Sequence, residues 1–414
     1  MRWSLAILAA VALCFTGCEK KQGQGPSSDQ NGTGANTTGK TDVKPNDTAG
    51  TTAQNTQTPP ADDSTIVIGE VGSLTGSEAT FGTSTRNGID LALEQVNAAG
   101  GVNGKKVQVR VYDDQGKPDE AANSTVRLIT QDKVKLILGE VSSTNSLAMA
   151  ERAQAAGVPM ITPSSTNEAV TAKGDYIFRV CFIDPFQGYA MAKFGRDTLK
   201  LQNVAVLEDN KSAYSLGLSD SFTRQFNEMG GKVVGKESFS KGDTDFRAQL
   251  TALKKLKPDG IYVPGYYTDV GLIARQAREL GIKATLLGGD GWESEKLFEL
   301  GGSAVDGSYY TNHYSPDTPD PVTQKFISAF KAKYGSVPDS LAALGYDAAM
   351  VAMDAMKRAK SLNGPDLRDA IAQTKDYAGA AGKVTLNEKR DAVKPAVVLK
   401  VADGKTSFAA SVSP

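Results

Sequence analysis

The fold of this chain is decided by an alternation that begins with Ile66-Val-Ile-Gly-Glu-Val71, a mostly apolar run of strand length. A stretch at 83–99 follows, and its apolar side chains recur on one face at helical spacing. The next run, at 106–112, again has the composition of a strand. Strands and helices that alternate in this way form a mostly parallel sheet that helices cover on both faces.

The same alternation continues along the chain as two successive series. The first continues with helices at 118–131 and 145–156 and strands at 136–139 and 158–161. After a break near 181–185, the second has helices at 186–200, 216–229, 246–256 and 270–280 and strands at 203–207, 232–237, 260–263 and 285–287. Helices at 322–334, 341–359 and 365–373 and strands near 383–386 and 396–401 are then distributed over both series.

A folded region of about 350 residues is too long for one compact core. The sequence therefore predicts an α/β protein with two doubly wound lobes and a cleft between them. We assign 64–184 and about 312–388 to the first lobe, and 185–311 and about 389–414 to the second.

The N-terminus has the layout of a secretory signal, with Arg2, an apolar run at 5–15 and small residues before Cys18. The run of about 11 residues is too short to span a bilayer, which takes about 20. Thr16-Gly17-Cys18 is similar to a bacterial lipobox, in which the thiol receives a lipid. We expect residues 1–18 to be a lipoprotein signal and Cys18 to be the lipidation site. Phe15 stands where Leu is usual, which leaves ordinary cleavage or a retained anchor as alternatives.

Residues 19–63 consist mainly of Gly, Ser, Thr, Asn, Gln, Lys and Pro. Such a segment cannot bury enough apolar surface to offset the entropy of ordering, so we expect a disordered tether. As a flexible coil it has an r.m.s. length on the order of 35–40 Å, enough to hold a folded domain near a membrane. No later stretch of the sequence is long and apolar enough for another membrane span.

The cysteine count argues against an internal disulfide, and the charge balance argues against nucleic-acid binding. Of the three cysteines, Cys14 lies in the signal and Cys18 is the expected lipidation site, which leaves Cys181 without a partner for a disulfide. The 46 Lys and Arg residues balance 47 Asp and Glu residues, and no basic cluster lies in the folded part. Nucleic-acid binding therefore has no support.

Hydroxyl groups gather in two neighbouring loops that follow strands of the first lobe, at the sheet edge where ligands of α/β proteins bind. In Gly139-Glu-Val-Ser-Ser-Thr-Asn-Ser146, Ser143 lies where a helix offers unpaired N–H groups and a partial positive charge, which suits a carboxylate. Met160-Ile-Thr-Pro-Ser-Ser-Thr166 adds Ser164 and Thr166 at the next strand end. The plainer interpretation is a helix N-cap and a solvated turn. The two loops side by side favour a clamp for one small anion.

A single carboxylate and several aromatic side chains follow other predicted strands. Gly288-Gly-Asp-Gly-Trp292 places Asp290 between glycines in the second lobe. An aspartate there is either a turn former or the counter-ion of an ammonium group, since a cation in a closed cleft needs a fixed opposite charge. Phe81, Tyr214 and Tyr266 either pack or form the walls of a side-chain pocket.

The sequence offers little for catalysis. His313 is the only histidine, so no histidine cluster is present to hold a catalytic zinc, and we expect His313 to be structural or exposed. No G-x-S-x-G elbow, P-loop or G-x-G-x-x-G motif is present. We expect no enzymatic activity, no metal and no cofactor.

Seven short motifs in the folded region form a more specific signal through their order and spacing. They are Gly72-Ser-Leu-Thr-Gly76, Asn97-Ala-Ala-Gly-Gly-Val-Asn-Gly104, Tyr112-Asp-Asp-Gln115, Met160-Ile-Thr-Pro163, Asp245-Phe-Arg247, Gly265-Tyr266 and Gln276-Ala-Arg-Glu-Leu-Gly281. Between residue 66 and about residue 401 the chain resembles the periplasmic branched-chain amino acid binding proteins, the leucine/isoleucine/valine-binding components of ABC uptake systems.

The resemblance implies the type I periplasmic-binding-protein fold, with three crossovers between the lobes and the C-terminal strands in the second lobe. In the family, groups that match Ser143, Ser164 and Thr166 hold the α-carboxylate and α-ammonium of the ligand. An acidic residue that matches Asp290 pairs with the ammonium after closure. One well-known member of the family has Glu at this position, and the shorter Asp leaves the identity of the ligand open.

The resemblance also implies that aromatic residues matching Phe81, Tyr214 and Tyr266 flank the ligand. The same member of the family has a disulfide whose two positions fall on Gly116 and Ser142, so this chain lacks it. We expect that loss to affect stability rather than function.

We therefore expect an exported solute-binding lipoprotein whose cleft closes on a small amino acid ligand, branched-chain or similar, and which docks on an ABC transporter permease. We expect a monomer that is held at the membrane by its N-terminal lipid, facing the periplasm or the cell exterior. One alternative is a ligand-sensing receptor subunit of the same fold, which differs in its partner. Another is a serine hydrolase that uses Ser143 or Ser164.

Overall fold

The structure of the protein is a computed structural model that describes residues 64–414. The chain divides into two units, residues 1–58 and 59–414, and both lobes belong to the second. The expected signal at 1–18, the lipidation site Cys18 and the expected tether at 19–63 lie outside the described residues. None of the helices within 64–414 is long and apolar enough to cross a membrane.

A five-stranded parallel sheet forms the centre of the first lobe, in the order β2-β1-β3-β4-β5. Its strands are β1 (Thr65–Gly72), β2 (Lys106–Asp113), β3 (Ile137–Leu138), β4 (Met160–Thr162) and β5 (Ile177–Arg179). The helices between them are α1 (Ala79–Ala98), α2 (Pro118–Thr130), α3 (Ser143–Ala156) and the 3-10 helix η1 (Thr171–Lys173). All strands point the same way, so the loops that follow them gather at one edge of the sheet.

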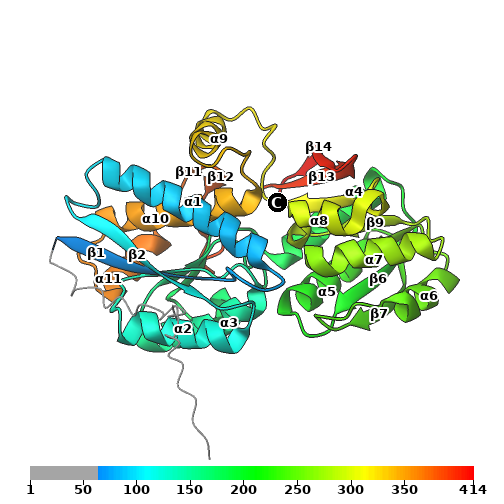
Figure 1. Ribbon diagram of the computed structural model, residues 1–414, viewed down its shortest axis with the longest axis horizontal. Helices are drawn as coiled ribbons and strands as arrows, with labels where there is room; N and C mark the ends of the chain where they lie inside the picture. Colours follow the sequence, from blue (N-terminus) through cyan, green and yellow to red (C-terminus); the bar gives the residue numbers. More distant parts are fainter. Residues whose placement is uncertain (1–63) are drawn as a thin grey trace, which may run out of the picture. The chain divides into compact units, whose positions relative to one another are not determined.

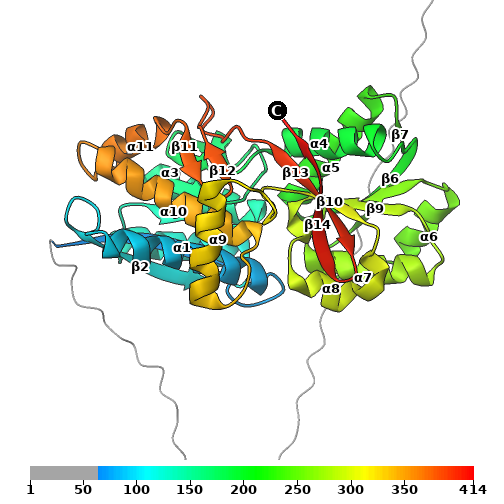
Figure 2. The ribbon, with the colours of Figure 1, turned by 90° about the horizontal axis from the view of Figure 1, so that it is seen from above.

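A seven-stranded sheet forms the centre of the second lobe, in the order β14-β13-β10-β9-β8-β6-β7. Its parallel strands are β6 (Asn203–Asp209), β7 (Lys232–Phe239), β8 (Gly260–Tyr262), β9 (Thr285–Gly288) and β10 (Tyr309–Asn312). Two antiparallel strands, β13 (Ala396–Ala402) and β14 (Lys405–Val412), extend the sheet beside β10 (Figure 2). The helices are α4 (Asp184–Asp197), α5 (Ala213–Glu228), α6 (Arg247–Lys255), α7 (Tyr267–Glu279), α8 (Glu295–Gly301) and the 3-10 helices η2 (Asp290–Trp292) and η3 (Gly302–Val305).

After β10 the chain returns to the first lobe and completes its core. This segment contains α9 (Pro321–Tyr334), α10 (Ser340–Arg358), α11 (Gly364–Ala372) and the hairpin of β11 (Tyr377–Gly379) with β12 (Gly382–Val384). Helix α10 packs along α1 (Figure 1). Leu344 and Val351 of α10 share one buried cluster with Ile68 of β1 and Ile89 of α1. The first lobe is therefore assembled from two segments that are far apart in the sequence.

The chain crosses between the lobes three times, after β5, after β10 and after β12. Phe182 in the first crossover stacks on His313 at the start of the second, with ring centroids 3.9 Å apart. Lys394 in the third crossover is also buried. The alternation of strands and helices that the sequence predicted for two α/β lobes is confirmed.

Several boundaries differ from the sequence prediction, and the differences matter at the sheet edges. Strands β5, β11 and β14 and helix α8 were not predicted, because three of them are short and β14 is an exposed edge strand without an apolar run. Helices α3, α5 and α7 begin at Ser143, Ala213 and Tyr267, two or three residues before the predicted starts. Their first turns carry polar and aromatic residues that show no helical periodicity. Ser143 and Tyr214 thus lie in first helical turns rather than in loops.

Candidate ligand-binding site

A small pocket lies where the two lobes meet. The first lobe contributes Phe81, Val141, Ser143, Ser164 and Leu341 to its lining, and the second contributes Tyr214, Tyr266, Asp290 and Gly291. The pocket is therefore built from residues of both lobes.

Most of the ligand residues that the sequence predicted line this one pocket, namely Phe81, Ser143, Ser164, Tyr214, Tyr266 and Asp290. Thr166 is not part of the lining, although it is fully buried nearby in the chain. Its carbonyl accepts the N–H of Asp184, the first residue of α4, at 2.9 Å. The backbone of Thr166 thereby joins the hydroxyl-rich loop of the first lobe to the start of the second.

One side of the pocket presents groups that suit an anion. Ser143 is the first residue of α3, and the side chain of Ser142 before it makes no capping hydrogen bond within the described part of the chain. The first N–H groups of α3 are thus available to a ligand, with the favourable end of the helix dipole behind them. Ser164 Oγ is buried at the same pocket and has no hydrogen-bond partner among residues 64–414. Uncapped N–H groups and an unpaired hydroxyl at one small pocket suit a carboxylate.

The other side presents Asp290, whose carboxylate is held by two neighbours. Gln187 Nε2 of α4 donates to Oδ1 at 2.8 Å and also lies 2.9 Å from Thr311 Oγ1. His313 Nε2 lies 2.9 Å from Oδ2. Asp290 is only 7% exposed, so a cation in the pocket meets a fixed negative charge that little water screens.

His313 is buried rather than exposed, and this decides between the two predicted alternatives for it. Burial lowers the pKa of His313, which keeps the ring neutral at pH 7. A carboxylate can only accept hydrogen bonds, so the hydrogen of the neutral ring lies on Nε2 and is donated to Asp290. The ring is fixed from its face by Phe182. The single histidine of the chain therefore orients a residue of the pocket.

Aromatic rings form a continuous wall of the pocket. Tyr214 and Tyr266 stack with centroids 5.2 Å apart and an interplanar angle of 9°. Phe81 of the other lobe meets Tyr266 edge to face at 5.4 Å. Burial raises the pKa of both tyrosines well above 10, so their hydroxyls stay neutral. Together with Val141 and Leu341 these rings offer an apolar surface to part of a ligand.

The glycines around Asp290 allow the close approach of this loop to the aromatic wall. A Cβ atom at Gly289 would lie 2.4 Å from Tyr214 Oη. A Cβ atom at Gly291 would lie 2.8 Å from Tyr266 Cδ1, while the Gly291 N–H donates to Tyr214 Oη at 3.1 Å. Glycine is therefore required on both sides of Asp290, because a larger residue at either position would collide with Tyr214 or Tyr266.

Direct contacts between the lobes surround the pocket. Tyr267 Oη of α7 donates to the carbonyl of Ser77 at 2.8 Å. Lys241 of the second lobe forms an ion pair with Glu78 of the first. Burial raises the pKa of Glu78, and the Lys241 ammonium opposes that shift. The structure therefore shows the two lobes in a closed arrangement.

Sequence reasoning missed four residues that shape this site. Val141 and Leu341 line the pocket, and Gln187 and His313 hold Asp290. Gln187 carried a weak signal, because it is a polar residue on the apolar side of a predicted helix. Leu341 carried none, since it starts a helix of the segment that returns to the first lobe.

The histidine geometry also bears on the predicted alternative of a serine hydrolase. The ring of His313 is bonded to Asp290, and Ser143 Oγ accepts the N–H of Asn167 at 3.2 Å. A serine nucleophile needs a neighbouring base that takes its proton. This arrangement uses the histidine for another purpose, and it offers no support for that alternative. No group of three or more His, Cys, Asp or Glu residues suited to a metal occurs in the part of the chain that is described.

Comparison with known proteins agrees with the architecture and extends over both lobes. Residues 65–406 match the periplasmic binding protein family. A Leu/Ile/Val-binding protein homolog of Brucella melitensis is 33% identical over 344 residues, which cover 82% of this chain and 92% of the relative. A crystal structure of a leucine-binding protein from Thermotoga maritima has a TM-score of 0.82 at 42% identity. The match covers 84% of this chain and 99% of the Thermotoga chain.

A second solved structure is similar to the same extent. The branched-chain amino acid transporter substrate-binding protein of Streptococcus pneumoniae, in complex with isoleucine, has a TM-score of 0.80 at 36% identity. The match covers 84% of this chain and 100% of the Streptococcus chain. The matched residues 65–406 contain the sheet of the first lobe, the sheet of the second lobe up to the start of β14, and all three crossovers. Membership of this family implies an exported protein. The chain therefore belongs to the periplasmic binding proteins and has their type I fold.

Proposed function

We propose that this protein captures an α-amino acid with an apolar side chain, of the leucine, isoleucine or valine kind, and delivers it to the permease of an ABC transporter. The names of its relatives support this role, since they are Leu/Ile/Val-binding and leucine-binding proteins. The solved relative with isoleucine bound supports the same ligand class.

The observation that carries the proposal is the placement of two opposite chemistries in one pocket. The uncapped start of α3 with Ser143 and Ser164 suits an α-carboxylate. Asp290 in the opposite lobe suits an α-ammonium, because a buried cation needs a fixed counter-ion. A zwitterion satisfies both groups at once.

The remaining walls suit an apolar side chain. Phe81, Val141 and Leu341 of the first lobe face the stacked pair of Tyr214 and Tyr266 at this pocket. Burying apolar ligand surface against them contributes about 25 cal/mol per Å2.

Binding and release follow from the two-lobe architecture without any change of covalent bonds. The ligand docks on one lobe, and rotation about the crossovers brings the second lobe onto it. Closure replaces water by fixed dipoles, which strengthens the charge contacts inside the pocket. The closed form, with contacts such as Tyr267 to Ser77 made, is the form that docks on the permease.

The N-terminal sequence supports lipid anchoring as part of the same proposal. The motif Thr16-Gly17-Cys18 supplies the acceptor thiol, and the polar segment 19–63 supplies a tether. A lipid on Cys18 would keep the binding domain near its permease, on the side of the membrane where the ligand is captured.

A thermal-shift screen of the twenty amino acids, followed by calorimetry on the hits, tests the ligand class. A ligand at 100 times its dissociation constant adds about 2.7 kcal/mol to the free energy of unfolding, which is easily measured. We expect leucine, isoleucine or valine to give the largest shift. A larger shift with an aromatic or aliphatic carboxylate that lacks an amino group would contradict the proposed class.

A further inference from the structure

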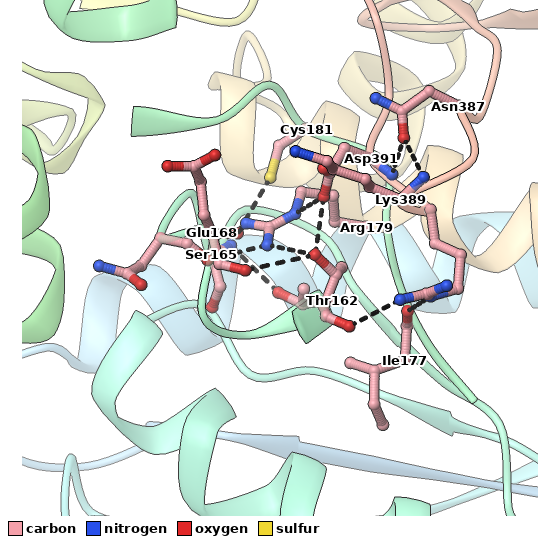
Figure 3. Close-up of polar contacts among 12 residues, drawn as sticks. Thr162, Ser165, Glu168, Ile177, Arg179, Cys181, Asn387, Lys389 and Asp391 are labelled. Carbon is pink, nitrogen blue, oxygen red and sulfur yellow. Dashed lines mark hydrogen bonds and ion pairs between the residues drawn. The ribbon is translucent and has the colours of Figure 1, made fainter. Parts of the chain in front are cut away.

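Arg179, the last residue of β5, is fully buried and holds four acceptors. Its guanidinium donates to the carbonyl oxygens of Ser165 and Asn167, the second at 2.8 Å. It also donates to Thr171 Oγ1 at 2.9 Å and to Asp391 Oδ1 at 2.7 Å. Figure 3 shows Arg179 between Ser165 on one side and Asp391 on the other. All three nitrogens of the guanidinium are therefore bonded.

On one side, Arg179 controls the position of the two hydroxyl-rich loops through Ser165. Ser165 Oγ lies 2.9 Å from the carbonyl oxygen of Val141 and 2.7 Å from Ser146 Oγ. Val141 lines the pocket, and Ser146 belongs to the first turn of α3, which begins at Ser143. Ser165 thus fastens its own loop to the start of α3, and Arg179 holds Ser165 by its carbonyl.

On the other side, Arg179 is fixed to the third crossover. Asp391 Oδ1 accepts a further hydrogen bond from Thr171 Oγ1 at 2.8 Å, and the Asp391 N–H donates to Asn387 Oδ1 at 3.0 Å. The N–H of Arg179 donates to the carbonyl of Arg390 at 3.2 Å. The segment 387–391 is thereby fastened to β5 shortly before the chain enters the second lobe.

A buried ion pair of this kind adds little net stability, because its desolvation offsets the attraction and an apolar pair of similar size often does as well. The specific contribution of arginine is geometric. Its planar fork binds several acceptors in fixed directions, which a lysine ammonium cannot do. Here two of these acceptors are carbonyls of the loop that carries Ser164.

We propose that Arg179, held by Asp391, is a positioning residue for ligand binding that couples the hydroxyl-rich loop Ser164–Asn167 to the third crossover. The proposal rests on the proposed function, because it assumes that Ser164 and the start of α3 receive the ligand carboxylate. Arg179 does not line the pocket. It fixes the direction of the groups that do, and it transmits their displacement to a segment on which the lobes rotate.

The first test is the double variant R179M/D391L, measured by calorimetry against the amino acid that binds wild type best. Removal of both charges avoids a lone buried charge, so the variant is expected to fold. We expect affinity to fall about tenfold to a hundredfold, as when a polar group of a site loses its alignment. The matching α-hydroxy acid should lose a similar factor, because Arg179 acts on the carboxylate side. If the double variant does not fold, R179K takes its place in the test. R179K keeps the charge but loses the planar fork, so it should also bind the amino acid more weakly than wild type.

The matched control is R358K. Arg358 of α10 lies in the same lobe and donates to the carbonyl of Ala370 at 2.8 Å and to Asp354, neither of which is in the hydroxyl-rich loop or the third crossover. It should bind the amino acid within about threefold of wild type. Double and lysine variants that fold and bind within the same range would overturn the proposal. Failure of wild type to bind any amino acid would instead overturn the proposed function, so the two failures are distinguishable.

Hydrogen exchange tests the coupling directly. Ligand addition should slow exchange of the amides at 387–394 in wild type, and the slowing should be lost in R179M/D391L at saturating ligand. Equal slowing in both proteins would mean that the crossover responds without Arg179, and the coupling would be refuted.

Discussion

Nε2 of His313 lies 2.9 Å from Oδ2 of Asp290, while Nε2 of Gln187 lies 2.8 Å from the other carboxylate oxygen. The three side chains come from η2, from α4 and from the residue that follows β10. All of these positions adjoin one sheet, that of the second lobe. The carboxylate is therefore held by residues attached to its own lobe.

Replacement of Asp290 by Asn is expected to separate a counter-ion from a turn residue. The change keeps the shape of the side chain and removes its charge. Breaking a buried charge pair costs about 3–5 kcal/mol, so affinity for the amino acid should fall by roughly two to three orders of magnitude. Calorimetry on D290N with the amino acid and its α-hydroxy analogue is the measurement, and the analogue should lose far less.

Glu299→Gln is the control for D290N, because Glu299 is an exposed carboxylate of the same lobe, paired with Lys296 at 2.5 Å. It should leave both affinities unchanged. Equal losses for the amino acid and its uncharged analogue in D290N would mean that Asp290 only shapes the loop.

The anion side of the pocket should respond to Ser143→Ala and Ser164→Ala but much less to Thr166→Ala. The first two variants remove hydroxyls that line the pocket, and each should weaken binding by about 1–3 kcal/mol. Thr166 lies outside the lining, so its substitution should act on the melting temperature instead. Calorimetry and thermal melts on the three proteins check this order. A T166A variant with the largest loss of affinity would restore Thr166 to the site.

Asp184 should make the free energy of unfolding depend on pH. Burial, the largest cause, raises the pKa of Asp184 to about 8; Thr166 opposes the shift, the Asp290 carboxylate adds to it, and Arg179 and Glu168 contribute smaller effects of opposite sign. The unfolded chain loses this proton near pH 3.9. Between about pH 4 and about pH 8 the folded state therefore holds one proton more, and stability falls as pH rises.

Asp184→Asn should abolish this part of the pH dependence. Relative to wild type, the variant should gain at most about 1.4 kcal/mol per pH unit between pH 4 and 8 in ligand-free urea denaturation. Asp197→Asn at the exposed end of the same helix is the control and should follow wild type in this range. Parallel curves for D184N and wild type would show that Asp184 is ionised in the folded protein.

Cys18→Ser tests the anchor. The substitution should move the protein from the membrane fraction to the soluble exported fraction and leave ligand affinity unchanged, because the expected tether separates Cys18 from the folded domain. Fractionation with a carbonate wash is the measurement. A variant that remains in the membrane after the wash would rule out the lipobox.

Much of the fold was predictable because its signals are local. The alternation of apolar runs and amphipathic stretches predicts two α/β lobes, and polar residues at strand ends predict the edge where Ser143, Ser164 and Asp290 meet at one pocket. A parallel sheet brings these loops together by its geometry, so no knowledge of side-chain contacts was needed.

The residues that sequence reasoning missed depend on contacts between distant segments. Leu341 reaches the pocket only because α10 packs along α1. Arg179 and Asp391 are separated by 212 positions, and nothing in either neighbourhood signals that they meet. The same holds for His313, whose role depends on the loop that carries Asp290. Local pattern predicts where loops gather, whereas the partner of a buried charge depends on the tertiary fold.

The division of the pocket between the lobes has a consequence for molecules other than the ligand. The carboxylate side is built by Ser143 and Ser164 of one lobe, and the cationic side is met by Asp290 of the other. An amino acid therefore bridges the two half-sites non-covalently, with its carboxylate on one lobe and its ammonium group on the other. A simple carboxylate or a simple amine carries only one of the two charged groups. We expect it to occupy one half-site and to compete with the amino acid, while the lobes stay apart. Such analogues would inhibit delivery of the amino acid. Small-angle scattering would then show that the protein saturated with an analogue keeps the dimensions of the ligand-free protein.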